Sequence, residues 1–255
     1  MNNLLKAEIF KMQRNRSFWM IFAISAGLSA LMHYLIMVDW WKMDGTSFDA
    51  VGLGDMNALS MFLVPVFFNL MIGTLAAFFI STEFGAGGVI KNQILSGRHR
   101  HLIYVSKYIV YTMGSVLIGV LVPLSTGVIM LAVTGNLEIL DGGNIVYLIR
   151  MHLLFILQYA GYTAMVTLLA VLTEDSGKTI IFSVLFTILM FVVGKVPVFN
   201  IVEIIYDHSI FQQFNLVMAP EMSAGMMTEA VIVGVLTIVV VAAIGCMVFG
   251  RKEIK

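Results

Sequence analysis

The residues of this sequence that could carry chemistry lie mainly in two polar stretches between long apolar runs. One of them, Ser176-Gly177-Lys178-Thr179, ends like a phosphate-binding loop, in which backbone N–H groups and a lysine hold phosphate oxygens. Such a loop also needs a glycine five residues before its Gly-Lys pair and a strand in front of it. Position 172 is Leu, and an apolar run precedes the stretch. We therefore expect no nucleotide-binding site here.

Side chains that could catalyse a reaction within a membrane are scarce. Membrane proteases and metal-dependent membrane enzymes need ionisable groups inside apolar helices, where such groups are costly and stand out. Here His33 is alone in its apolar run, and His152 lies at the end of another. His99 and His101 flank an arginine in a basic loop, and the single cysteine, Cys246, excludes an internal disulfide. We predict that the chain is not an enzyme and binds no metal or cofactor of its own.

Ion-coupled transporters are a closer alternative, since they also consist of apolar helices with a few polar groups. They usually hold carboxylates or broken helices near the middle of the membrane. None of the six apolar runs described below contains Asp or Glu, which favours an energy source outside the chain. An ion-coupled transporter, and a channel or sensor that works without an ATPase, both stay open as alternatives.

The second polar stretch, residues 81–107, is the only long internal segment that is both polar and basic. Its glycine-rich residues 85–88 break the preceding helix, and VIKNQIL then predicts about two turns of a short helix. The apolar positions of this helix are Val89, Ile90, Ile94 and Leu95. Gly97 can adopt the left-handed backbone conformation that often ends a helix. We expect RHRH and Lys107 to place cations at the lipid headgroups. An ordinary basic loop at the inner membrane face accounts for this composition equally well.

The composition indicates which elements must position these residues. The 255 residues are 60% hydrophobic and 12% charged, which is too little charge to solvate a globular surface. The mean hydropathy is +0.95, and we predict an all-α integral membrane protein. Six transmembrane helices are expected at about residues 18–38, 58–80, 104–134, 149–173, 179–199 and 230–250. Together they form one transmembrane domain, residues 18–250.

The charges predict how this domain is oriented. Residues 1–17 form an expected amphipathic interfacial helix, with Lys6, Lys11, Arg14 and Arg16 as membrane-surface anchors. With this helix inside the cell, twelve of the fifteen Lys and Arg residues lie on the inner side, as the positive-inside rule requires. Both termini are then cytoplasmic, and residues 81–103 form a cytoplasmic loop.

A substrate path or gate has candidate residues in the spans and on the outer side. They are the polar or aromatic residues Asn69, Gln158, Tyr162, Phe211 and Phe214. Residues 200–228 are apolar but interrupted by acids and a proline, so we expect short re-entrant or interfacial helices before the sixth span. Pro65 and Pro123 can kink the second and third spans and are candidate flex points.

The stretch after the second span resembles a motif of a known family. It reads Glu-Phe at 83–84, then a glycine-rich break, Val-Ile-Lys-Asn-Gln-Ile-Leu-Ser-Gly at 89–97, an arginine, and Ile-Tyr-x-x-Lys at 103–107. With the basic amphipathic N-terminus and six spans, this pattern looks like the type-2 permease (transmembrane) subunits of ATP-binding cassette transporters. The architectural resemblance covers nearly the whole chain, whereas the specific motif is confined to residues 83–107.

The resemblance implies a function, partners and roles for particular residues. In that family the stretch forms a coupling helix that docks in a cleft of a separate ATPase subunit. A coupling role would fall on Glu83, Val89, Ile90, Lys91, Asn92, Ile94, Leu95, Gly97, Arg98 and Arg100. Two ATPase subunits would bind ATP and Mg, and a second permease copy or paralogue would complete the pore, with no nucleic acid involved.

The resemblance also implies a location and a class of cargo. It implies the bacterial cytoplasmic (plasma) membrane, crossed several times by the chain. Small Gram-positive permeases of this kind include exporters of antimicrobial or toxin peptides and immunity pumps. We therefore expect export of a hydrophobic or amphipathic substrate such as a peptide, toxin or antibiotic.

Overall fold

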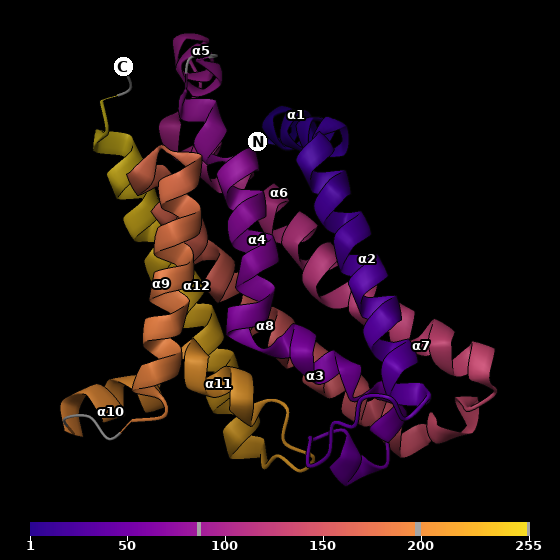
Figure 1. Ribbon diagram of the computed structural model, residues 1–255. Helices are drawn as coiled ribbons and strands as arrows, with labels where there is room; N and C mark the ends of the chain where they lie inside the picture. Colours follow the sequence, from indigo (N-terminus) through magenta and orange to yellow (C-terminus); the bar gives the residue numbers. More distant parts are fainter. Residues whose placement is uncertain (86–87, 197–199, 254–255) are drawn as a thin grey trace.

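The computed structural model describes residues 1–85, 88–196 and 200–253, and within them every regular element is a helix (Figure 1). The α-helices are α1 (Asn2–Arg14), α2 (Arg16–Met37), α3 (Ala58–Leu63), α4 (Pro65–Phe79), α5 (Val89–Leu95), α6 (Arg100–Val116), α7 (Val122–Thr134), α8 (Gly142–Thr173), α9 (Ser176–Val193), α10 (Asn200–Asp207), α11 (Ile210–Leu216) and α12 (Ala224–Arg251). The 3-10 helices are η1 (Asp49–Val51), η2 (Gly54–Met56), η3 (Ser81–Phe84) and η5 (Leu137–Ile139), and η4 (Leu117–Leu121) is a π-helix. Parts of the predicted glycine-rich break (residues 86–87), fifth span (residues 197–199) and C-terminus lie outside the described residues.

Six helical segments of the described chain are long and apolar enough to cross a membrane, as predicted. They are Arg16–Met37, Pro65–Phe84, Arg100–Thr134, Gly142–Thr173, Ser176–Val193 and Ala224–Arg251. Several extend beyond the apolar runs, because a helix can continue into the headgroup region, where its charges are solvated. The predicted apolar runs contain no acid, but two of the longer helical segments extend past them and include Glu83 and Glu229 near one end.

Both prolines that were expected to kink spans occur where the helix changes. Val64 is extended, as residues before proline tend to be, so α3 ends at Leu63 and Pro65 opens α4. Pro123 is the second residue of α7 and follows the π-helix η4, so the hydrogen bond that proline cannot donate is missing where the helical pattern already changes. The predicted second span is therefore divided into α3 and α4, whereas the third continues through the π-helix as one helical segment, Arg100–Thr134.

One end of the bundle collects the basic segments. The N-terminus, the last described C-terminal residues and α5 all lie at this end, while α3, α10 and α11 lie toward the other (Figure 1). We call the first the basic end because its elements and adjoining loops carry Lys6, Lys11, Arg14, Arg16, Lys91, Arg98, Arg100, Lys107, Lys178, Arg251 and Lys252. Helix α1 crosses this end and packs on α6.

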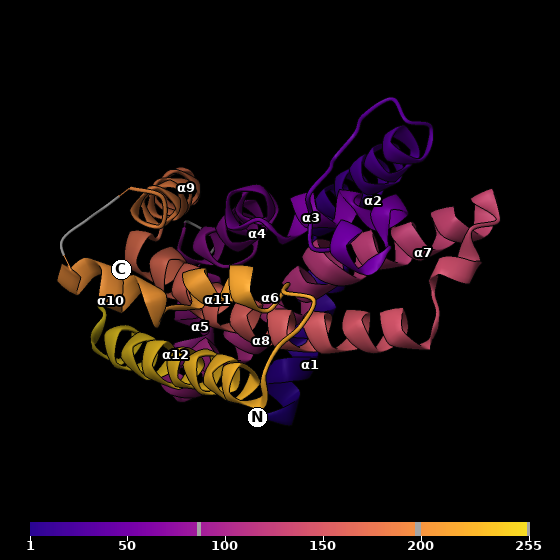
Figure 2. The ribbon, with the colours of Figure 1, turned by 90° about the horizontal axis from the view of Figure 1, so that it is seen from below.

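Helix α8 is the centre of the fold. It contacts α4, α6, α9, α11 and α12, and seen along the bundle α9 and α12 lie on either side of it (Figure 2). Aromatic rings fill the interior where α4, α8 and α11 meet, with Phe68 against Tyr159, Tyr162 and Phe214 at centroid distances of 4.9, 5.2 and 5.3 Å. These edge-on pairs fix the middle of the bundle.

Candidate functional site

Four charged side chains meet at the basic end, and we call them the charge cluster: Glu8, Lys11, Glu83 and Lys107. Lys11 Nζ lies 2.5 Å from Glu8 Oε1 and 2.7 Å from Glu83 Oε1. Lys107 Nζ lies 3.2 Å from Glu8 Oε2 and also donates to Glu83 Oε2. The cluster thus joins three elements that are distant in sequence, namely α1, η3 and α6.

The charge cluster is largely removed from water. The side chain of Glu8 is fully buried, that of Lys107 is 3% exposed, and that of Lys11 is 29% exposed. Each carboxylate pairs with both lysines, so the four charges balance. Removing one member of a buried pair costs about 3–5 kcal/mol, because an uncompensated charge stays behind. The cluster should therefore hold α1, η3 and α6 together as one unit.

Protonation of the two cluster groups on α1 reflects this pairing. Burial acts to raise the pKa of Glu8, but Lys107 and Lys11 outweigh it and hold the pKa below its ordinary value. Burial acts to lower the pKa of Lys11, but Glu83 and Glu8 outweigh it and raise the pKa. Both groups are therefore charged across the neutral range.

The short helix α5 rests one face on this cluster. Gln93 Nε2 donates to Glu8 Oε1 at 2.9 Å, and Ile90 is fully buried while Ile94 packs against the core. On the other face Lys91 and Asn92 are exposed. Leu95, which follows one turn later, is 75% exposed. Helix α5 thus has one face fixed to the helix bundle and another, with apolar and polar residues, that is exposed.

A second polar feature lies on α9, and we call it the hydroxyl stripe: Thr179, Ser183 and Thr187. These are the buried residues of α9, spaced four apart on one face. Thr179 Oγ1 and Ser81 Oγ are 2.7 Å apart, Asn69 Nδ2 donates to Ser183 Oγ at 3.4 Å, and Tyr162 Oη lies 2.5 Å from Thr187 Oγ1. Neutral hydrogen bonds therefore attach α9 to η3, α4 and α8.

Close packing accompanies the hydroxyl stripe. A Cβ atom placed on Gly73 of α4 would lie 2.6 Å from Ser183 Oγ, so α4 and α9 approach as closely as they do because Gly73 has no side chain. Small residues that permit such contact are typical of helix pairs in membranes, where lipid is as apolar as leucine and gives helices no hydrophobic reason to associate.

The turn η3 connects the two features. Within four residues, Ser81 bonds to Thr179 of the hydroxyl stripe and Glu83 bonds to both lysines of the charge cluster. Gly88, which starts α5, has a φ of +56° that favours glycine. A displacement of α5 can thus reach α9 through one 3-10 turn.

The residues predicted for coupling separate into three groups. Glu83 is in the charge cluster, and Ile90 and Ile94 face the protein rather than a partner. Arg100 Nη1 donates to Lys252 O at 2.5 Å and to Gly250 O at 3.2 Å, so this side chain holds the end of α12. The remaining predicted residues are partly or fully exposed: Val89, Lys91, Asn92, Leu95, Gly97 and Arg98. Gly97 has the predicted left-handed conformation, with φ of +80°.

The predicted surface anchors also divide. Lys6, Arg14 and Arg16 are exposed on α1 and at the start of α2. Lys11 differs from them, because it is held in the charge cluster and only 29% of its side chain is exposed. Lys107, which was expected at the lipid headgroups, is also held in the charge cluster and is buried.

The residues predicted for a substrate path all lie inside this single subunit. Phe211, Phe214 and Tyr162 belong to the aromatic interior, and Gln158 Nε2 donates to Ala230 O at 2.7 Å. Asn69 and Tyr162 are the partners of the hydroxyl stripe. A path along these residues would need the aromatic contacts to open.

The sequence analysis missed Glu8 and the hydroxyl stripe, although the sequence contains a signal for each. Glu8 is a lone acid in a basic helix, at the same spacing as Leu4 and Met12, which are buried with it. That spacing could have indicated an inward-facing carboxylate. The hydroxyl stripe could have been found because Thr179, Ser183 and Thr187 recur every four residues in an apolar helix.

The fragment resembling a phosphate-binding loop is the start of α9. Asp175 caps this helix by accepting from the Lys178 backbone N–H at 2.8 Å, and helix α8 rather than a strand precedes it. Among residues 1–85, 88–196 and 200–253, no group of three His, Cys, Asp or Glu residues is placed to hold a metal ion.

Comparison with protein families places the chain in a known one. A family model described as "ABC-2 family transporter protein" matches residues 4–194, which include most of α1, all of η3 and α5, and the hydroxyl stripe with its partners. Neither a curated protein nor a solved structure matches the chain.

Proposed function

The chain belongs to the ABC-2 family of transporter proteins, as a multi-pass permease subunit, and we propose that it couples ATP hydrolysis by a partner to export through α5. The observation that carries this proposal is the two-sided construction of α5. One face is fixed to the charge cluster through Gln93, and the other presents Leu95 to the surroundings.

The exposed face of α5 is the proposed docking surface for the ATPase. A leucine that is 75% exposed beside Lys91 and Asn92 is an apolar anchor with a polar rim, which is the usual composition of a protein-binding site. Family membership implies an ATPase partner. Two ATPase subunits, which bind ATP and Mg, and a second permease copy or paralogue would complete the transporter.

The proposed transmission runs from α5 to α9. Closure of the ATPases would push on α5, which bears on Glu8 through Gln93 and on the rest of the charge cluster. Because Glu83 and Ser81 both belong to η3, a displacement of the charge cluster would also move Ser81 and its partner Thr179. The packing of α9 against α4 and α8 would change as a result. The break before Pro65 and the π-helix before Pro123 would allow the second and third spans to follow.

We further propose that the cargo is hydrophobic or amphipathic, such as a peptide, toxin or antibiotic, and that the chain resides in a bacterial cytoplasmic membrane. The many large apolar side chains exposed along the middle of α9 and α12 are compatible with such a cargo. Asn69, Gln158, Tyr162, Phe211 and Phe214 would line the path when the interior opens.

Copurification and ATPase assays test the docking surface. Leu95→Asp and Lys91→Glu should abolish or strongly reduce copurification of the ATPase and stimulation of ATP hydrolysis in mild detergent. Lys6→Glu, an exposed change at the same end of the bundle, is the matched control and should change neither. Replacing Ile90 is unsuitable for this test, because its burial makes it a folding residue. Undiminished stimulation in Leu95→Asp would refute the assignment.

The alternatives predict other results. A channel or sensor would purify without an ATPase, and transport into vesicles would proceed without ATP. An ion-coupled transporter would stop when the ion gradient is collapsed, whereas the proposed exporter would continue as long as ATP is supplied.

A further inference from the structure

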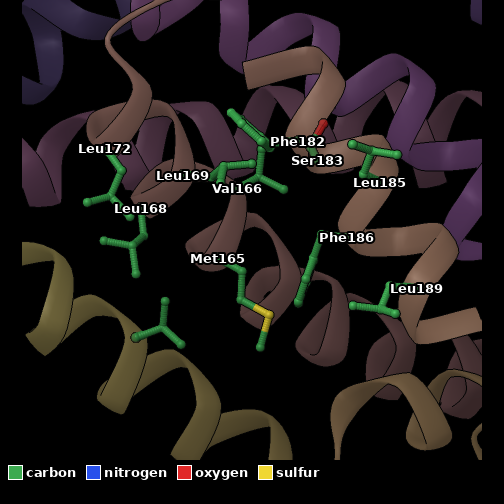
Figure 3. A pocket seen from close by; sticks show the side chains of 11 residues that line it. Met165, Val166, Leu168, Leu169, Leu172, Phe182, Ser183, Leu185, Phe186 and Leu189 are labelled. Carbon is green, nitrogen blue, oxygen red and sulfur yellow. The ribbon is translucent and has the colours of Figure 1, made fainter. Parts of the chain in front are cut away.

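An apolar cavity of about 560 Å³ lies between α8, α9 and α12. Figure 3 shows its lining side chains converging on one space from these helices. They include Met165, Leu169 and Leu172 of α8, Phe182 and Phe186 of α9, and Val241 of α12. The polar residue in the lining is Ser183, which belongs to the hydroxyl stripe.

The cavity exists because α9 binds the bundle through its polar face. With Thr179, Ser183 and Thr187 turned inward, the apolar side chains of α9 point away from the core. Phe182, Leu185 and Leu189 are accordingly 48%, 55% and 58% exposed. In a membrane-spanning helix this surface faces acyl chains, so lipid rather than water adjoins the cavity.

A cation lies at the end of the cavity that is nearest the basic end. Lys178 is exposed and makes no salt bridge with any described residue. It precedes Phe182 by four residues, so both side chains occupy one face of α9. The neighbouring Lys252, by contrast, pairs with Glu174 at 3.0 Å. Within the described part of the chain, Lys178 is therefore a cation without a salt bridge on the basic-end side of the apolar lining.

The dimensions fit one leaflet of a bilayer. Leu189, the lining residue of α9 farthest from the basic end, comes eleven positions after Lys178, which corresponds to about 16 Å of helix. Half of a hydrocarbon core about 30 Å thick is close to that length.

From this combination we propose that the cavity binds an acyl chain of an anionic phospholipid, whose phosphate pairs with Lys178. A lipid is the occupant that matches both ends of the site, because a chain fills the apolar lining and an anionic headgroup meets the cation. The bound lipid would then belong to the leaflet on the side of the basic end. This inference needs the membrane and the cavity but not an ATPase.

Brominated lipids test the proposal, because bromine quenches tryptophan fluorescence at contact range. The reporter is Phe186→Trp in a background of Trp19→Phe, Trp40→Phe and Trp41→Phe, all three of which are exposed positions. The matched control is Ile24→Trp, a lipid-exposed position on α2 at a similar number of residues from the basic end. Both variants are placed in phosphatidylcholine vesicles that contain a minor fraction of brominated phosphatidylglycerol or brominated phosphatidylcholine.

We expect brominated phosphatidylglycerol to quench Phe186→Trp at a concentration lower by a factor of about five, the attraction of roughly one lysine for an anionic lipid. Lys178→Gln should remove this preference, Lys178→Arg should keep it, and Ile24→Trp should show none. High salt should weaken it with Lys178 intact, which gives a test free of folding effects. Equal quenching by both lipids would overturn the proposal. So would absence of quenching, which would mean that protein, such as a second copy, covers the cavity.

Discussion

The charge cluster and the hydroxyl stripe lie on either side of η3, and they hold the fold by opposite means. The cluster uses four nearly dry charges from three elements, whereas the stripe uses three neutral hydroxyl groups on one helix. A buried charge left without its partner costs about 3–5 kcal/mol, while an interhelical hydrogen bond in a membrane is worth about 0.6 kcal/mol. We infer that the contacts of the charge cluster are rigid, whereas the hydrogen bonds of the hydroxyl stripe can break and form again.

The largest effect should follow from breaking the charge cluster. Lys107→Met leaves Glu8 and Glu83 with one partly exposed lysine, so the free energy of unfolding should fall by about 3–5 kcal/mol. Thermal unfolding in detergent measures the loss. Lys107→Met combined with Glu83→Gln should recover part of it, and Lys6→Met is the surface control. A single variant as stable as the parent would mean that the cluster contributes little.

A steric change at the stripe should have a medium effect. Gly73→Val forces α4 from α9, because a Cβ atom alone would lie 2.6 Å from Ser183 Oγ, and overpacking of this kind costs about 1–3 kcal/mol. Adding Ser183→Gly should relieve the clash and restore stability, as measured by the same unfolding assay. No recovery in the double variant would place the strain elsewhere.

The pH dependence of the free energy of unfolding should further distinguish the charge cluster from the hydroxyl stripe. The lowered pKa of Glu8 contributes stability that is present above its unfolded value of 4.5 and is lost as the pH falls through the folded pKa. The raised pKa of Lys11 contributes stability that is present below 10.5 and is lost as the pH rises through the folded pKa. Stability should thus be level between these limits and should fall in acid less steeply in Glu8→Gln. Identical acid profiles would contradict the assignment.

The smallest effect should come from single hydroxyl groups. Thr187→Val keeps the shape of the side chain and removes its hydrogen bond to Tyr162, so the free energy of unfolding should change by about 0.6 kcal/mol. Thr228→Val, at an exposed position of α12, is the control. A loss as large as that of Lys107→Met would contradict the inference that the hydroxyl stripe is held more weakly than the charge cluster.

The sequence predicts the spans better than the contacts between them. Hydropathy indicated the six spans and glycines marked the limits of α5, because both are local properties of the chain. The burial of Lys107 is not local, since it depends on Glu8, which lies 99 residues away. The bond from Gln93 to Glu8 is likewise not local, since it depends on α1, which no pattern within residues 89–95 contains.

The central claim, that η3 carries motion from α5 to α9, is tested most directly by a distance measurement. Spin labels at Ile188→Cys on α9 and Ile24→Cys on α2, both exposed positions, in a Cys246→Ser background, report how α9 sits in a reconstituted complex with the ATPase. We predict that trapping with ATP shifts this distance, and that Lys107→Met with Glu83→Gln removes the shift while ATPase binding persists. A shift that survives in the double variant would contradict the claim.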